Sequence, residues 1–332
     1  MKQSFGTIKG EPVTLYELEN EFLVLKVMNY GATVVSIIDK ATGIDIVKGY
    51  DSAEEYYKGT AHLGAFVGRT ANRTRNAQFK LNGSTYHITA NEHGVTNLHG
   101  GEGFDKKMYS VEEGENSVRF TRISPDGEEG YPGNMHVAVT YTLNGRTIEM
   151  KAEAVSDEDT LFAITNHNYY NLDGSDSILD HTLKINAGTY SPNDDLSISL
   201  DTCLPVAGTP FNFRTGKKLG TDINADVEQI QKFRGYDHHF EIEGTGMRTF
   251  AELTGKKLKL TVASDLPGMH MYTANFLDII GKNGIESGPH SAVCIEPEYY
   301  PNAINYPGIE PKPVLEAGMH GESNITWTIE EL

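Results

Sequence analysis

Val139-Thr140-Tyr141-Thr142-Leu143-Asn144-Gly145-Arg146-Thr147-Ile148 contains the clearest fold signal in this chain. Asn-Gly stands between two runs in which apolar and polar residues alternate, and this pattern is the strongest short-range indication of a β-hairpin. The stretch Phe79–Ile88 has the same form around Asn82-Gly83. We therefore predict two antiparallel hairpins.

Strand-like runs continue on both sides of these hairpins. They lie at Phe22–Val27, Ala32–Ile38, Val118–Ile123, Leu183–Ile185, Lys257–Val262 and Ser291–Ile295. Helical patterns are few: a short helix over Asp51–Lys58, and helical spacing of apolar residues over Ile223–Phe233. So few helices cannot cover both faces of a parallel sheet. Because no linker interrupts the chain, we predict one all-β domain over residues 1–332, a large antiparallel β-sandwich.

The composition narrows the class of partner. The chain has 332 residues, with 28 Lys plus Arg and 46 Asp plus Glu, a formal net charge of −18. This charge repels nucleic acid and anionic membrane surfaces, so we expect a neutral or cationic partner. Two cysteines support neither a disulfide framework nor a zinc ribbon. Without a signal peptide or a run approaching ~20 apolar residues, we expect a cytoplasmic protein and no membrane partner.

Polar and aromatic residues gather in five segments. One is Thr165–Leu172, where His167 follows an apolar run and stands among amide and phenol side chains. The other four are Gly68–Arg73, Asn97–Lys106, Gly235–Phe240 and Glu296–Ala303. Together they offer a His and Glu acid–base pair, hydrogen-bonding groups suited to hydroxyls, and Tyr rings. This inventory is typical of a site for a neutral polyhydroxylated ligand.

Simpler interpretations exist for several of these residues. His167 could be a core histidine, and Arg69 and Arg73 could be surface charges in ion pairs. The pair His238-His239 favours packing, because neighbours in an extended chain point to opposite sides. A metal site could be assembled from His99, His167 and His239, but no short ligand spacing supports it.

Several further motifs match one known family. They are Asn29–Ala32, Gly68–Arg73, Leu98–Gly101, Gly103–Lys106, Ser124–Asn134, Thr165–His167, Pro205–Phe211, Gly235–His238, Tyr272–Phe276 and Glu296 before Pro301. They occur in the family's order over almost the whole chain. The chain therefore resembles the aldose 1-epimerases, also called galactose mutarotases.

This resemblance implies a single-domain β-supersandwich that interconverts the α and β anomers of free aldohexoses such as galactose and glucose. It implies that Glu296 is the general base on the C1 hydroxyl and His167 the general acid on the ring oxygen. The substrate-binding residues that it implies are Asn72, Arg73, His99, Tyr169 and Asp237. His270 stands where many members have Gln, and it could still donate to a hydroxyl. No cofactor and no metal are expected.

Anomer interconversion itself requires an acid and a base, independently of the resemblance. Opening a hemiacetal removes a proton from O1 and adds one to the ring oxygen, so a carboxylate and a protonated imidazole can act together. Reference pKa values of about 4.3 for Glu and about 6.5 for His predict a rate that falls at both pH extremes.

Three other functions remain open at this point. The first is a carbohydrate-binding β-sandwich without catalysis, against which the His167 and Glu296 pair counts. The second is an epimerase acting on hexose 6-phosphates, which would need a cluster of basic residues. The third is a preference for disaccharides with a free reducing end. The protein could be a monomer or a homodimer.

Overall fold

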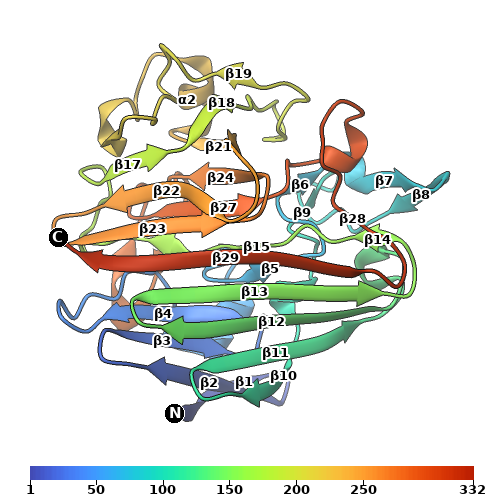
Figure 1. Cartoon of the computed structure of the whole chain (residues 1–332), viewed down its shortest axis with the longest axis horizontal. Helices are drawn as coiled ribbons and strands as arrows, with labels where there is room; N and C mark the ends of the chain where they lie inside the picture. Colours follow the sequence, from blue (N-terminus) through green and yellow to red (C-terminus); the bar gives the residue numbers. More distant parts are fainter.

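Antiparallel strands make up most of the computed structural model, which describes residues 1–332. The largest sheet has nine strands, and Figure 1 shows it crossing the molecule with β29 in red between β13 in green and β23 in orange. In spatial order its strands are β10 (Ser110–Glu113), β11 (Ser117–Ser124), β12 (Met135–Asn144), β13 (Thr147–Ser156), β29 (His320–Glu331), β23 (Leu258–Ser264), β22 (Arg248–Thr254), β17 (Thr182–Ile185) and β20 (Lys217–Lys218). Every neighbouring pair is antiparallel, as predicted.

Both predicted hairpins are confirmed. Strands β12 and β13 turn at Gly145-Arg146, because Asn144 is still paired with Thr147, and Gly145 has a positive φ of 57°. Strands β7 (Gln78–Leu81) and β8 (Ser84–His87) turn at Asn82-Gly83, where both residues have positive φ, 50° and 80°. These are the two residue types that adopt this conformation most readily, which is why the pair marks the turn.

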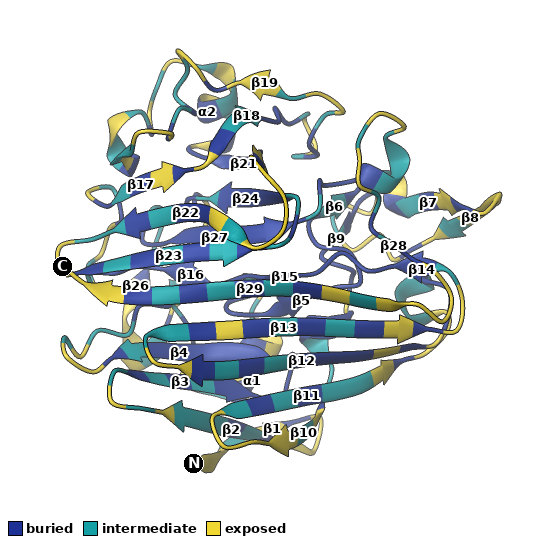
Figure 2. Cartoon of the chain, viewed as in Figure 1, coloured by how far each residue is buried: buried dark blue, intermediate teal, exposed yellow.

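Burial follows the alternation of the strands. Along β13, the side chains of Ile148, Met150, Ala152 and Ala154 are buried, and the residues between them are half-buried or exposed (Figure 2). These buried side chains belong to one hydrophobic cluster of 55 residues that runs from Leu23 to Ile329. Residues near both ends of the chain therefore share one core, and the single domain over residues 1–332 stays a prediction.

Two smaller sheets pack with the large one. The six-stranded sheet has the order β16 (Tyr169–Tyr170), β27 (Val293–Glu298), β24 (Gly268–Tyr272), β21 (Asp237–Ile242), β18 (Ala187–Tyr190) and β19 (Leu204–Pro205). The four-stranded sheet consists of β1 (Lys2–Ile8), β2 (Glu11–Glu19), β3 (Leu23–Met28) and β4 (Thr33–Asp39). The Tyr16 ring of β2 meets the Phe120 ring of β11 edge-on at 5.9 Å, so this sheet packs against the nine-stranded one.

Short strand pairs brace the loops around these sheets. Besides β7 and β8, they are β14 (Thr160–Leu161) with β28 (Val314–Leu315), β15 (Thr165–Asn166) with β5 (Phe66–Val67), β25 (Ile279–Ile280) with β26 (Glu286–Ser287), and β6 (Arg73–Thr74) with β9 (Asn97–Leu98). Six single 3₁₀ turns complete the regular structure: Arg75–Ala77, Phe104–Lys106, Glu128–Gly130, Leu219–Thr221, Lys282–Gly284 and Ala303–Asn305.

Only two α-helices are present. The helix α1 (Ala53–Lys58) begins after Ser52, whose hydroxyl accepts from the Glu55 backbone N–H, as the predicted N-cap requires. The predicted helix over Ile223–Phe233 is too long, because only α2 (Glu228–Phe233) is helical. Residues 223–227 are not helical, yet the apolar spacing still buries Ile223 and Ile230. Neither helix is long enough to cross a membrane.

Candidate active site

Register in the six-stranded sheet creates the floor of the candidate site. Across β21, β24 and β27, His270 lies opposite both His239 and Glu296. Because side chains alternate between the two faces of a sheet, residues paired in this way share a face. This face carries Asp237, His239, His270, Tyr272, Glu296 and Glu298, of which all but His239 and Glu298 line the cavity. The alternation in these three strands thus brings six polar side chains together.

Loops enclose a cavity of about 330 Å³ above this floor. All eight residues that the sequence singled out as catalytic or substrate-binding line it: His167, Glu296, Asn72, Arg73, His99, Tyr169, Asp237 and His270. A larger hollow of about 640 Å³ lies on the nine-stranded sheet, far from these residues. We assign the site to the smaller cavity, because its lining combines buried acidic and basic groups.

Asn72 and His99 form one wall of the cavity and hold each other in place. The His99 backbone N–H donates to the Asn72 carbonyl at 3.0 Å, and the Asn72 backbone N–H donates to His99 Nδ1 at 3.2 Å. Both residues have positive φ, 59° and 54°, at the ends of the paired strands β6 and β9. These tight turns direct both side chains into the cavity.

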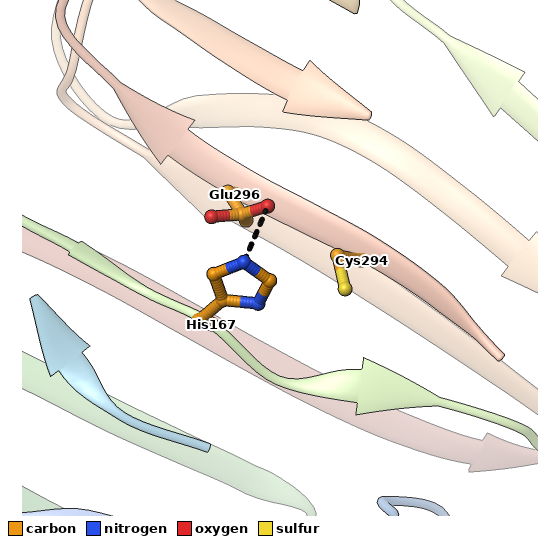
Figure 3. A group of neighbouring side chains, drawn as sticks. All are labelled: His167, Cys294 and Glu296. Carbon is orange, nitrogen blue, oxygen red and sulfur yellow. Dashed lines mark ion pairs between the residues drawn. The ribbon is translucent and has the colours of Figure 1, made fainter. Parts of the chain in front are cut away.

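His167 and Glu296 face each other across the site, as Figure 3 shows. His167 Nε2 lies 3.6 Å from Glu296 Oε1, and the two side chains are only 8% and 3% exposed. The ring of Tyr169 stacks on that of His167, with 5.0 Å between centroids and 16° between planes. The sheet therefore fixes the carboxylate, and the stacked phenol fixes the imidazole.

Comparison with known proteins identifies the family. The sequence model of the family described as aldose 1-epimerase matches residues 14–327. The chain belongs to the aldose 1-epimerase family. The galactose mutarotase of Homo sapiens is 36% identical over 331 residues, covering 96% of this chain and 94% of its own. The aldose 1-epimerase of Haemophilus influenzae is 36% identical over 316 residues and 92% of each chain.

A solved structure gives the same result for the fold. The crystal structure of galactose 1-epimerase from Lactobacillus acidophilus superimposes with a TM-score of 0.88 at 29% identity, covering 100% of this chain and 98% of the other. The predicted β-supersandwich with few short helices is therefore correct.

Burial sets the protonation of the acid–base pair in this epimerase-family site. It raises the pKa of the Glu296 carboxyl well above its ordinary value, and the nearby negative charge of Asp237 raises it further. Burial also lowers the pKa of His167 to about 3, with a contribution from His62. Each group thus resists becoming charged by itself. Because the two groups are close neighbours, they are best described as a pair that shares one proton.

Asp237, in contrast, is stabilised as a carboxylate. Burial opposes its ionisation, but a 2.7 Å hydrogen bond from His270 and the charge of Arg73 outweigh it, so the pKa of Asp237 lies below its ordinary value. His270 uses its other nitrogen, Nδ1, to accept from the Asn72 side-chain amide at 3.1 Å. Asn72, His270 and Asp237 therefore form a connected row of hydrogen-bonding groups along the cavity.

The two arginines of Gly68–Arg73 have different environments, and the surface interpretation of Arg69 is wrong. Arg69 is 2% exposed and donates to the backbone carbonyls of Ser124, Pro125, Pro132 and Gly133, away from the cavity. Arg73 lines the cavity, and its guanidinium forms a bidentate ion pair with Glu92 at 2.9 and 2.8 Å. Only Arg73 can therefore meet a ligand.

His238 and His239 lie on opposite sides of their strand, as expected. His238 packs among aromatic rings and contacts Gln229, whereas His239 donates to the buried Glu298 at 3.0 Å. His239 is thus unavailable for the conceivable metal site with His99 and His167. Another set of side chains is close enough together to be considered as metal ligands. A nitrogen of His167, the sulfur of Cys294 and an oxygen of Glu296 lie within 4.8 Å of one another (Figure 3). A cation there would compete with proton transfer.

Sequence reasoning missed several residues of this site. His62, Tyr272 and Phe276 also line the cavity, and Glu298 lies buried beneath Asn72. The i, i+2 spacing of Glu296 and Glu298 in a predicted strand could have placed both on one face. No comparable signal marks His62, because it lies in an irregular loop.

Proposed function

We propose that this chain interconverts the α and β anomers of free aldohexoses, galactose and glucose among them, by opening and reclosing the hemiacetal ring. The observation that carries this proposal is the convergence of His167 and Glu296, 3.6 Å apart, on one buried cavity. The two oxygens that exchange protons during ring opening are bonded to the same carbon. An acid and a base must therefore converge on neighbouring atoms, and this pair does so.

In the proposed mechanism, Glu296 accepts the proton of the C1 hydroxyl while His167 delivers a proton to the ring oxygen. The bond between C1 and the ring oxygen breaks, and C1 becomes a carbonyl. Rotation about C1–C2 then presents the other carbonyl face, and the two groups reverse their roles as the ring closes. Asn72, Arg73, His99, Tyr169, Asp237 and His270 would hold hydroxyls and keep the rest of the sugar in place while C1 turns.

A hexose 6-phosphate is a poorer candidate for the substrate. The cavity lining contains no lysine, and its one arginine, Arg73, is already paired with Glu92. Of the neighbouring arginines, Arg69 is enclosed by carbonyl groups and Arg75 pairs with Asp194 at 2.5 Å. No unpaired guanidinium therefore lines the cavity to receive a dianionic phosphate. The neutral hydroxyls of a free sugar suit the same groups better.

Polarimetry of freshly dissolved α-D-galactose and α-D-glucose, in dilute buffer with and without the protein, tests the proposal. We expect the protein to accelerate the approach to anomeric equilibrium for at least one sugar. Binding in a calorimeter without acceleration would instead favour a carbohydrate-binding module. If neither sugar binds or reacts faster, but the protein accelerates the mutarotation of a phosphorylated sugar or a reducing disaccharide, that compound would be the substrate instead.

The rate should be nearly independent of pH over a broad range. The active form of the His167–Glu296 pair holds one proton. Activity is lost when a second proton binds to the pair or when the single proton leaves it. Burial lowers the first of these pKa values, with that of His167 about 3, and raises the second, that of Glu296, well above its ordinary value. The plateau of kcat should therefore be wider than the interval from about 4.3 to about 6.5 between the reference values. Polarimetry between pH 4 and pH 9, with circular dichroism to verify folding, measures this pH dependence of kcat. A bell-shaped profile confined to the interval between the reference pKa values would contradict the prediction.

We also infer a cytoplasmic location, since both cysteines are free thiols. The choice between monomer and homodimer stays a prediction.

A further inference from the structure

His62 is fixed beside the proposed general acid. It belongs to the loop between α1 and β5 and lines the same cavity as His167. Two backbone hydrogen bonds of 2.9 Å tie this loop to His167, one from the Gly64 N–H and one to the Ala65 carbonyl. The His62 ring lies 4.8 Å from that of His99, centroid to centroid. Two imidazoles therefore stand side by side in the cavity wall.

Asp105 determines which nitrogen of His62 carries the hydrogen. Its carboxylate oxygen Oδ2 lies 2.8 Å from His62 Nδ1, and its side chain is only 2% exposed. A carboxylate accepts, so Nδ1 carries the hydrogen in the neutral ring. The remaining nitrogen, Nε2, then offers a lone pair and acts as an acceptor.

His99 has the opposite arrangement. Its Nδ1 accepts the backbone N–H of Asn72 at 3.2 Å, so the hydrogen of the neutral ring lies on Nε2. Burial lowers the pKa of His99 well below its ordinary value, in agreement with a neutral ring. His99 therefore presents a donor next to the acceptor of His62.

We propose that His62 and His99 jointly bind one hydroxyl of the sugar, His62 accepting its hydrogen and His99 donating to its oxygen. A hydroxyl is at once a donor and an acceptor, so it is the group that this pair complements. Asp105 is a positioning residue that acts through His62. This inference rests on the proposed function for the identity of the ligand, and it adds His62 to the residues that touch substrate.

His62→Phe keeps a ring in the wall and removes the acceptor. We expect the Kd of the sugar, from calorimetry, to rise about tenfold, the effect of one lost hydrogen bond with its partner left unpaired. The kcat should change less than about threefold, because His167 and Glu296 remain. His62→Gln, whose amide oxygen can accept, should recover part of the affinity. His87→Phe, at an exposed histidine of β8, serves as the matched control and should leave Kd unchanged.

A series of monodeoxy aldohexoses, including the 1-deoxy sugar, distinguishes a hydrogen bond from a packing effect. For the one sugar that lacks the bound hydroxyl, His62→Phe and the unmodified protein should bind equally, while the other sugars keep the tenfold ratio. The same ratio for every sugar would overturn the proposal. Because calorimetry measures binding alone, a protein that binds sugars but accelerates no mutarotation would refute the proposed function and leave this test intact.

Discussion

Glu296→Gln should lower the kcat of mutarotation about 10³-fold, within the range that positioned acid–base groups contribute. Glutamine keeps the shape of the side chain but cannot accept the C1 hydroxyl proton. The neighbours of Glu296 on the floor, His270 and Asp237, hydrogen-bond to each other and leave its position to the strand. Sugar affinity, measured by calorimetry, should therefore change much less than kcat.

Glu298→Gln is the matched control, because it makes the same chemical change two residues along β27 on the same face. Glu298 accepts from His239 and Asn72 and does not line the cavity. We expect its kcat to fall less than about tenfold. Equal losses in the two variants, or a normal rate in Glu296→Gln, would remove Glu296 from its proposed role. His167→Gln should resemble Glu296→Gln.

Arg69→Met should lower the free energy of unfolding by about 3–5 kcal/mol, at the upper end for a single substitution, because it breaks a buried hydrogen-bond network. The guanidinium donates to four backbone carbonyls and to the hydroxyls of Ser124 and Thr160. Methionine would fill part of the space and leave these acceptors unpaired, each at a cost of about 1–3 kcal/mol before relaxation. Urea unfolding followed by circular dichroism measures the change.

The exposed Arg214 provides the control for this measurement. Arg214→Met removes the same charge from an exposed side chain whose one hydrogen bond is to Asn212, so the free energy of unfolding should change by less than about 0.5 kcal/mol. Because Arg69 points away from the cavity, the kcat of folded Arg69→Met should stay near normal. A stable protein with a large loss of activity would show that Arg69 serves the site instead.

The sequence allowed prediction of those features that depend on local pattern. The Asn-Gly pairs at 82–83 and 144–145 mark the two hairpins, although the second turn falls one residue later, at Gly145-Arg146. Strand alternation determines which side chains are buried. The motifs around His167 and Glu296 predicted the contents of the cavity through family resemblance. Their physical convergence depends on contacts between residues more than a hundred positions apart, which local pattern does not encode.

The surroundings of individual side chains, in contrast, could not be inferred from the sequence. Arg69 and Arg73 look alike in Gly68–Arg73, yet one is caged by carbonyl groups and the other faces the cavity. The role of His62 was likewise not visible in the sequence, because it depends on a contact with Asp105, forty-three positions away. Nor did the reference pKa values of Glu and His anticipate the shifts caused by burial, which disfavours the charged form of each group.

The place of β29 in the nine-stranded sheet has a consequence for biosynthesis. Strand β29 joins β13 to β23 and follows both in the sequence, so until its 12 residues leave the ribosome the sheet exists only as two separate halves. Each half then exposes an unpaired strand edge, the surface on which nascent chains aggregate or recruit chaperones. Trp327, the only tryptophan, is buried on this strand beside Tyr141, and its fluorescence will therefore report the moment at which the newly made chain closes.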